Sequence, residues 1–219
     1  MKVIIFGATG MVGAAALIEC LEDPDITKVL TVGRRLTGRE HPKLEEFVHE
    51  DFLDFSAAQE RFADYDACLW CLGVSSAGMS EADYRRVTQH FTEAACKAMY
   101  AANPQMSVCF VSGSGSDASA RGMWQRVKGD AENAVLGMGF ARAHAFRPAG
   151  ILPRKGVVSR VPGYRFAYDY FGWLFALLRK VAPSMVTDSD QLGRALIRVA
   201  KNGHAKPILE GVDINAVCD

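Results

Sequence analysis

Three glycines close to the amino terminus are spaced so that they can hold a phosphate-bearing ligand. They form a GxxGxxG pattern directly after an apolar run and directly before a helical stretch. Glycine at these positions allows a tight turn, a close approach of the backbone to a pyrophosphate and close packing of helix on strand. The amino terminus of the helix adds a partial positive charge and free N–H groups. The pattern predicts a dinucleotide site with contacts from Gly7, Thr9, Gly10, Met11, Val12 and Gly13.

Two adjacent arginines indicate which dinucleotide is bound. In a site for NAD, an Asp or Glu about 20 residues beyond the glycines holds the ribose 2′-hydroxyl. This sequence has Arg34 and Arg35 there instead. Guanidinium groups make bidentate, charge-assisted hydrogen bonds to phosphate. The pair therefore favours NADP(H) over NAD(H), with the alternative that both arginines belong to a solvated loop.

An acid and an aromatic residue follow the third predicted strand. Asp51 and Phe52 stand where an acid could bind the adenine amino group and an aromatic ring could cover the base. They fit equally well as a loop acid and a core phenylalanine.

The elements that must position these residues alternate between strand and helix. Strands are expected at 2–6, 28–33, 46–49, 66–72, 105–111, 143–147 and 207–210, and helices at 14–22, 57–63, 80–102, 124–136 and 189–202. This alternation predicts an α/β, Rossmann-type doubly wound parallel sheet of about seven strands, in the order 3-2-1-4-5-6-7, with helices on both faces. A single domain is expected over residues 1–219, with 152–202 as a small substrate-side segment.

Composition narrows the classes of function. The 219 residues carry 25 Lys+Arg and 25 Asp+Glu, so the chain lacks the one-signed field that attracts nucleic acid, and no such partner is predicted. A chain of this length does not need disulfides, so its six cysteines favour a reducing compartment and a cytoplasmic protein. Residues 1–6 lead straight into the first strand and show no cleavable signal. The five histidines are scattered, and no metal is predicted.

Aromatic residues are concentrated in one later stretch. Seven of them lie within residues 164–175. The stretch is too short and too charged to span about 30 Å of bilayer, so no transmembrane segment is predicted. It fits a core or homodimer-forming helix, a wall or lid of an apolar pocket for a small-molecule substrate, or a surface membrane contact.

Several short motifs occur in the order that is found in one known superfamily. They are Gly7–Gly13, Asp51-Phe52, Cys71–Val74, Tyr84–Thr88, Val111–Ser114, Lys128–Glu132 and Arg147–Ile151. The sequence resembles the atypical, extended-like short-chain dehydrogenase/reductases. Within them it is most similar to the Tat-interactive-protein-type oxidoreductases, NADPH-binding proteins related to the NAD-dependent sugar-nucleotide epimerases. The resemblance implies further cofactor contacts at Leu72, Gly73, Val111, Lys128, Pro148, Gly150 and Ile151.

The catalytic motif of this superfamily is incomplete. Its members use a Tyr-x-x-x-Lys pair on one helix, with a Ser or Thr that holds the substrate carbonyl. The resemblance assigns the lysine to Lys128 and the serine to Ser112 or Ser114, but Trp124 stands at the tyrosine position. Indole has a donor N–H and no proton that exchanges readily near neutral pH, so Trp124 is not a general acid.

Three interpretations follow from Trp124. The protein is an oxidoreductase on a small carbonyl or alcohol, with Ser112 or Ser114 polarising the carbonyl and water or Tyr84 supplying the proton. Alternatively, it binds NADPH without turnover and acts as a redox-sensing or interaction protein. In the third interpretation the alignment is shifted, and Tyr164 or Tyr168 reaches the site.

Overall fold

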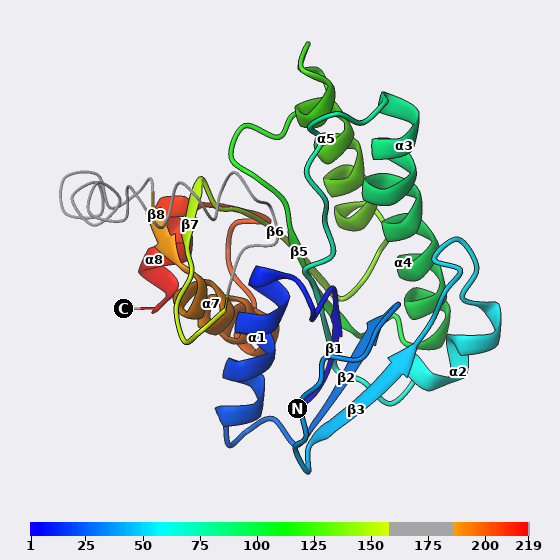
Figure 1. Cartoon of the computed structure of the whole chain (residues 1–219), viewed down its shortest axis with the longest axis vertical. Helices are drawn as coiled ribbons and strands as arrows, with labels where there is room; N and C mark the ends of the chain where they lie inside the picture. Colours follow the sequence, from blue (N-terminus) through cyan, green and yellow to red (C-terminus); the bar gives the residue numbers. More distant parts are fainter. Residues whose placement is uncertain (158–185, 219) are drawn as a thin grey trace.

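The computed structural model describes residues 1–157 and 186–218. Seven strands form a wholly parallel sheet in the order β3-β2-β1-β4-β5-β6-β9 (Figure 1). Their bounds are β1 (Lys2–Phe6), β2 (Lys28–Gly33), β3 (Leu44–Val48), β4 (Ala67–Trp70), β5 (Ser107–Val111), β6 (Arg142–Arg147) and β9 (Ile208–Glu210). The predicted fold class and strand order are confirmed, with β9 as the last strand of the sheet.

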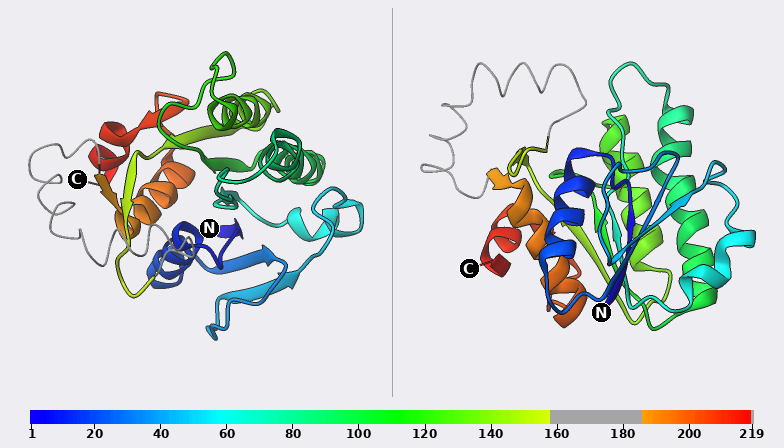
Figure 2. Two further views of the ribbon diagram at one scale, coloured as in Figure 1. Left: turned by 45° about the horizontal axis from the view of Figure 1, so that its top comes forward. Right: turned by 60° about the horizontal axis from the view of Figure 1, so that its bottom comes forward.

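Helices cover both faces of this sheet, as Figure 2 shows. One face carries α1 (Met11–Glu22), α7 (Ser189–Asn202) and α8 (Gly211–Cys218). The other carries α2 (Gln59–Phe62), α3 (Glu81–Arg85), α4 (Phe91–Ala102) and α5 (Met123–Leu136), with the short 3-10 helix η1 (Ser56–Ala58) before α2. This is the doubly wound arrangement that the sequence predicts.

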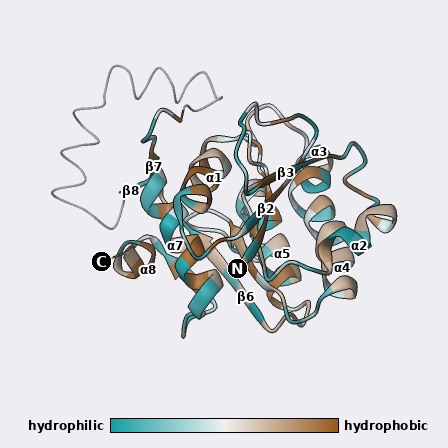
Figure 3. Cartoon of the chain, turned by 90° about the horizontal axis from the view of Figure 1, so that it is seen from below, coloured by the Kyte–Doolittle hydropathy of each residue, from teal (hydrophilic) through white to brown (hydrophobic). Residues whose placement is uncertain are grey.

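The first strand shows why the core has two halves. Val3 and Ile5 pack among the apolar residues of α1 and α7, whereas Ile4 and Phe6 pack on the opposite face. Successive side chains of a strand point to opposite sides, so a continuous apolar run is buried on both faces of a parallel sheet. Helix α7 is amphipathic, with both hydrophilic and hydrophobic residues along its length (Figure 3).

The helix predicted over residues 80–102 contains an interruption. A π-helical turn, η2 (Arg86–His90), separates α3 from α4. Ser80 caps the amino terminus of α3, where its Oγ accepts a hydrogen bond of 3.1 Å from the backbone N–H of Asp83. Single π-turns inside α-helices frequently mark functional sites.

A second, two-stranded parallel sheet pairs β7 (Gly150–Leu152) with β8 (Val186–Asp188). Helix α7 follows β8 directly and packs against α1 and the sheet, so residues 189–202 of the expected substrate-side segment lie in the main core. The aromatic stretch 164–175, with Tyr164 and Tyr168, lies outside the described residues.

Within residues 1–157 and 186–218, no helix is both long and apolar enough to cross a bilayer. The same ranges hold no cluster of three His, Cys, Asp or Glu side chains suited to a metal ion.

Candidate functional site

The fold brings the glycine loop to the point where the strand order reverses. Strand β1 pairs with β2 on one side and with β4 on the other. In open α/β sheets, ligands bind outside the carboxyl ends of the strands at such a point. The loop that follows β1 therefore lies at the expected place for a ligand.

Two of the loop glycines are required by close backbone contacts. Gly7 has φ +79°, and a Cβ on it would lie 2.6 Å from the backbone nitrogen of Leu72. A Cβ on Gly13 would lie 2.2 Å from the carbonyl oxygen of Gly7. Helix α1 begins at Met11 without a side-chain cap on Gly10. Its first N–H groups therefore lack a capping side chain and are oriented to bind an anion.

A cavity of about 690 Å³ extends from this loop. Ligand pockets usually measure about 300–1,000 Å³, so the cavity is large enough for a cofactor. Eight predicted contacts line it: Gly7, Thr9, Gly10, Arg34, Arg35, Phe52, Leu72 and Gly73. The residues that sequence reasoning missed are Gly33, Glu50, Cys71, Val74, Ser75, Met79, Asp83, Arg86, Val87 and Phe91.

Arg34 and Arg35 form one wall of the cavity. Both are exposed and follow directly after β2. Within the described residues, neither side chain makes an ion pair or a hydrogen bond. The loop that carries them is tied down farther along, where the backbone N–H of Thr37 donates to Glu46 Oε1 over 2.8 Å. The two guanidinium groups are thus available to an anionic ligand.

Asp51 and Phe52 occupy different surroundings. Phe52 is only 2% exposed and packs against Phe91, with ring centroids 5.5 Å apart, although it also contributes to the cavity wall. Asp51 is exposed, and its Oδ1 accepts a hydrogen bond of 3.0 Å from the N–H of Leu53. Among the acids that follow β3, Glu50 lines the cavity rather than Asp51.

Lys128 connects α5 to the ends of two central strands. Its Nζ donates a hydrogen bond of 3.1 Å to the carbonyl oxygen of Val111 and lies 5.3 Å from the centroid of the Phe110 ring. A Cβ on Gly73 would lie 4.0 Å from the same Nζ. Burial lowers the pKa of Lys128 to about 8, and the charge of Glu132 opposes this shift only partly. The Lys128 ammonium is therefore a stronger acid than that of an ordinary lysine.

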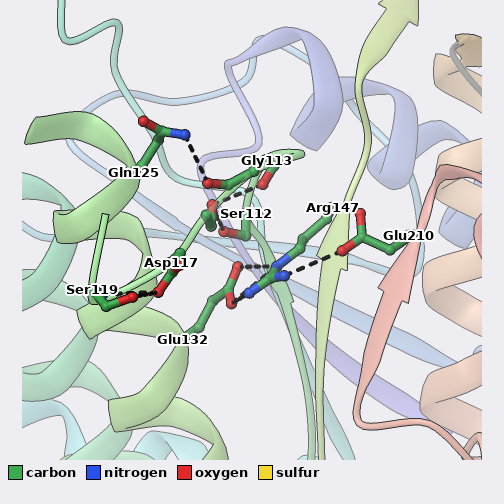
Figure 4. Close-up of polar contacts among 10 residues, drawn as sticks. Ser112, Gly113, Asp117, Ser119, Gln125, Glu132, Arg147 and Glu210 are labelled. Atoms are coloured by element: carbon green, nitrogen blue, oxygen red, sulfur yellow. Dashed lines mark hydrogen bonds and ion pairs between the residues drawn. The ribbon is translucent and has the colours of Figure 1, made fainter. Parts of the chain in front are cut away.

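Glu132 is held by an arginine and forms no ion pair with Lys128. Arg147 Nε donates to Glu132 Oε1 over 3.0 Å, and its Nη2 donates to Oε2 over 2.5 Å. Figure 4 shows Arg147 between Glu132 and Glu210, whose Oε1 accepts from Nη1 over 3.2 Å. The Glu132 side chain is almost fully buried, and its carboxylate raises the pKa of Arg147. This cluster joins α5, β6 and β9, and sequence reasoning missed it.

The hydroxyl groups of the two candidate serines, Ser112 and Ser114, differ in hydrogen bonding and exposure. The Oγ atoms of Ser112 and Ser116 lie 2.9 Å apart, and Ser116 Oγ donates to the carbonyl oxygen of Gly113 over 2.7 Å (Figure 4). A hydroxyl has one proton, so Ser112 must donate its own to Ser116. Ser114 is exposed, and its backbone N–H donates to the carbonyl oxygen of Pro148 over 3.1 Å.

Trp124 lies beside the same serine loop. Cβ atoms built on Gly113 and Gly115 would lie 3.7 and 3.9 Å from its indole ring, so both glycines leave space for the ring. The residue is 37% exposed. Tyr84, the other proton donor considered, is 3% exposed on α3, and burial raises the pKa of its phenol. None of the candidate catalytic residues, Tyr84, Ser112, Ser114, Trp124 and Lys128, lines the cavity, so their catalytic roles stay predictions.

The remaining predicted contacts lie around the ends of β5, β6 and α1. Val111 ends β5 and is buried, and Pro148 follows directly after β6. Gly150 and Ile151 begin β7, which pairs with β8. Met11, Val12 and Gly13 form the first turn of α1. None of these residues lines the described cavity, so their cofactor contacts stay predictions.

Comparison with known proteins identifies the family. A family model described as the NAD dependent epimerase/dehydratase family matches residues 3–121, which is more than half of the chain. The chain belongs to that family. The resemblance to short-chain dehydrogenase/reductases is confirmed, and the family is one whose cofactor class is a nicotinamide dinucleotide.

Two curated relatives and one solved structure extend the match. "Protein fmp52, mitochondrial" of Emericella nidulans is 27% identical over 203 residues, which cover 90% of this chain and 85% of the relative. "Protein HTATIP2" of Rattus norvegicus is 29% identical over 176 residues, covering 79% of this chain and 71% of the relative. The structure of MoeE5 in complex with UDP-glucose and NAD has a TM-score of 0.68 at 17% identity. It covers 95% of this chain and 75% of that chain, and the similarity shows a shared fold.

The expected cytoplasmic location is wrong on this comparison. The fungal fmp52 relatives of this epimerase-family chain are named as mitochondrial proteins. Unpaired cysteines indicate a reducing compartment, but they do not distinguish one reducing compartment from another.

The epimerase-family cofactor class fits the residues that are present. The glycine loop offers a cradle that a Cβ on Gly7 or Gly13 would fill. The uncapped α1 amino terminus suits a pyrophosphate, and the cavity has the volume for a large ligand.

Proposed function

We propose that the chain is an NADP(H)-dependent oxidoreductase that acts on a small carbonyl or alcohol compound. The observation that carries the proposal is the cavity itself. It joins the glycine loop to Arg34 and Arg35, whose guanidinium groups have no partner within the described residues. A 2′-phosphate is the feature of NADP(H) that such a pair binds. The proposed preference for NADP(H) differs from the case of MoeE5, whose complex contains NAD.

Each end of the site has its own task. The N–H groups at the start of α1 bind the pyrophosphate, and Arg34 and Arg35 bind the 2′-phosphate. At the other end, Lys128 Nζ holds the nicotinamide ribose, as the resemblance to short-chain dehydrogenase/reductases implies. When bound, the nicotinamide supplies or accepts the hydride.

The proton in this proposal moves without a tyrosine. Ser114 presents an exposed hydroxyl that can polarise a carbonyl oxygen, whereas Ser112 already donates to Ser116. Lys128 holds a proton on Nζ below about pH 8 and loses it above, which suits exchange with water at the site. The buried Tyr84 is unsuited to this task.

A second function is favoured by one observation. The Trp124 ring lies against Gly113 and Gly115, and the family resemblance assigns this residue to the tyrosine position. A protein that binds NADPH without turnover, as a redox-sensing or interaction protein, needs no donor there. Turnover of a carbonyl panel with NADPH distinguishes the two functions. If Trp124→Tyr is active and the wild type is inactive, the natural protein is a binder.

The test of cofactor binding compares two arginine variants. We expect the double variant Arg34→Ala/Arg35→Ala to weaken NADPH binding by about 100-fold and NADH binding by less than threefold, because two charge-assisted contacts are lost. Arg39→Ala is the matched control, since Arg39 is an exposed arginine of the same loop that does not line the cavity. Titrations that follow nicotinamide fluorescence give the dissociation constants. An equal loss for NADPH and NADH contradicts the 2′-phosphate role.

A further inference from the structure

Two neighbouring arginines of the helix that contains the π-turn have different surroundings. Arg85 is fully engaged: it forms ion pairs of 2.6 Å with Asp130 and 3.1 Å with Glu81, and it donates a hydrogen bond to Gln89. Arg86 is exposed and lines the cavity. Within the described residues its side chain has no ion pair and no hydrogen bond. Arg85 therefore holds helices together, and Arg86 is available to a ligand.

Arg86 lies three residues after Asp83, which also lines the cavity, so ordinary helical spacing turns Arg86 toward it. The π-turn brings Phe91 to the same side. The backbone N–H of Phe91 donates to the carbonyl oxygen of Arg86, which is the i to i+5 bond of a π-helix. In a regular α-helix, Arg86 would point roughly 140° away from the side of Phe91, because successive residues turn by about 100°. The wider turn lets Arg86, Val87 and Phe91 line the same cavity.

The position of Phe91 indicates which end of the cavity Arg86 serves. Phe91 packs against Phe52, which follows β3, and β3 pairs with β2. The end of β2 carries Arg34 and Arg35. Arg86 thus belongs to the adenosine end of the cavity and comes from the helix wall rather than from the β2 loop.

We infer that Arg86 is a third arginine of the 2′-phosphate site and helps to select NADP(H) over NAD(H). This inference rests on the proposed function. The cavity lining carries three arginines but only two acids, Glu50 and Asp83, so its charge favours the more anionic cofactor. Arg86 comes from a helix rather than from the β2 loop, so its guanidinium adds charge-assisted hydrogen bonds to a phosphate from a separate element.

The experiment measures dissociation constants for NADPH, NADH and 2′,5′-ADP with the full chain. For Arg86→Ala we expect binding of NADPH and 2′,5′-ADP to weaken by about tenfold and binding of NADH by less than twofold, since one charged contact is lost. The NADPH loss should shrink as salt is raised, because screening weakens the wild-type contact. Arg86→Lys should recover part of the affinity, and Arg39→Ala, which removes the same charge, should bind like the wild type.

Two results overturn the inference. One is an equal loss for NADH and NADPH, which assigns Arg86 to the adenine or the pyrophosphate. The other is unchanged NADPH binding in Arg86→Ala. If Arg86→Ala does not fold, Arg86→Gln replaces it under the same two criteria, because glutamine removes the charge but keeps a longer side chain with a polar end. A wild type that does not prefer NADPH to NADH contradicts the proposed function as well, whereas a wild-type preference that Arg86→Ala leaves intact contradicts this inference alone.

Discussion

The two ends of the candidate site differ in what their polar groups already bind. At the arginine end, Arg34, Arg35 and Arg86 have no side-chain partner within the described residues. The proposed lysine end, Ser112, Trp124 and Lys128, does not line the cavity, and there the Lys128 ammonium donates to Val111 and the Ser112 hydroxyl to Ser116. A ligand meets three guanidinium groups without a described partner at the arginine end, whereas at the lysine end it must share groups that already make a bond, Lys128 with two N–H donors left and Ser112 only as an acceptor.

The largest expected effect comes from the loop between the two ends. In Gly13→Ala the new Cβ would lie 2.2 Å from the carbonyl oxygen of Gly7, so the loop must move. We expect NADPH binding to weaken by at least about 100-fold, because overpacked backbone does not relax without displacement. Gly33→Ala adds the same methyl group to a glycine of the cavity wall, but its Cβ has its nearest neighbour at 3.6 Å and forces no backbone to move, so its loss should be much smaller. If Gly13→Ala binds NADPH nearly as well as the wild type in calorimetry, the glycine loop does not bind the cofactor.

The next largest effect concerns the stability contributed by the ion pair between Arg147 and Glu132, whose glutamate lies on the same helix as Lys128. Arg147→Met leaves the buried Glu132 carboxylate without its main partner. We expect unfolding free energy to fall by about 3–5 kcal/mol, as when one member of a buried ion pair is removed. Glu210→Gln should cost less than about 1 kcal/mol, because that carboxylate is 48% exposed. Urea unfolding measures the free energy of unfolding of both variants. A similar loss in Arg147→Met and Glu210→Gln would show that the buried ion pair does not stabilise the fold.

A smaller effect separates stability from binding at Lys128. Burial lowers its pKa from 10.5 to about 8, so folding must take the charged form out of water below pH 8. Between pH 8 and 10.5 the unfolded chain binds the proton and the folded chain does not, so this group makes stability rise with pH. The free energy of unfolding of Lys128→Met should therefore exceed that of the wild type by roughly 1–3 kcal/mol at pH 7. This difference should vanish above pH 10.5.

The same Lys128→Met variant should lose affinity for NADPH, because it lacks the ribose donor. Unfolding at pH 7 and pH 10.5, together with cofactor titration at pH 7, measures both properties. A variant that is destabilised at pH 7 would show that the Lys128 ammonium is well solvated or paired. A variant that gains stability and keeps its affinity would remove Lys128 from the cofactor site.

The smallest effect concerns the loop at the arginine end. Glu46 accepts hydrogen bonds from the backbone N–H and the hydroxyl of Thr37, close to Arg34 and Arg35 in the chain. Glu46→Gln weakens this tie without changing the cavity lining. We expect NADPH affinity to fall about two- to threefold and NADH affinity to stay constant, since the loop is less well ordered. An equal change in NADPH and NADH affinity would mean that the hydrogen bonds between Glu46 and Thr37 do not position Arg34 and Arg35.

Local patterns predicted most of the fold. The apolar runs and the glycine loop specify the strands and the first helix, because strand burial and tight turns depend on neighbouring residues. The three-residue strands β7 and β8 are too short to show a period. The π-turn at Arg86–His90 contains neither Gly nor Pro, so nothing local marks it.

The site was predicted where a motif marks it and missed where tertiary contacts create it. Gly7, Gly10 and Arg34, which line the cavity, were predicted from spacing, whereas the contact of Lys128 with the cofactor stays a prediction from the family resemblance. Arg86 was missed, because its place in the cavity wall depends on how its helix packs in the folded chain. Two further contacts were also missed, because their side chains meet only in the folded chain. They are the hydrogen bond from Ser112 to Ser116 and the ion pair between Arg147 and Glu132. Glu50, next to the predicted Asp51, was missed because adjacent loop residues point in different directions.

If Arg34 and Arg35 bind a 2′-phosphate, the wild-type protein must prefer NADPH to NADH. A calorimetric titration with both cofactors in the same low-salt buffer measures this preference. NADPH should bind at least about tenfold more tightly, because a charged contact contributes roughly that factor or more. Equal affinity, or tighter binding of NADH, would contradict this role of the two arginines.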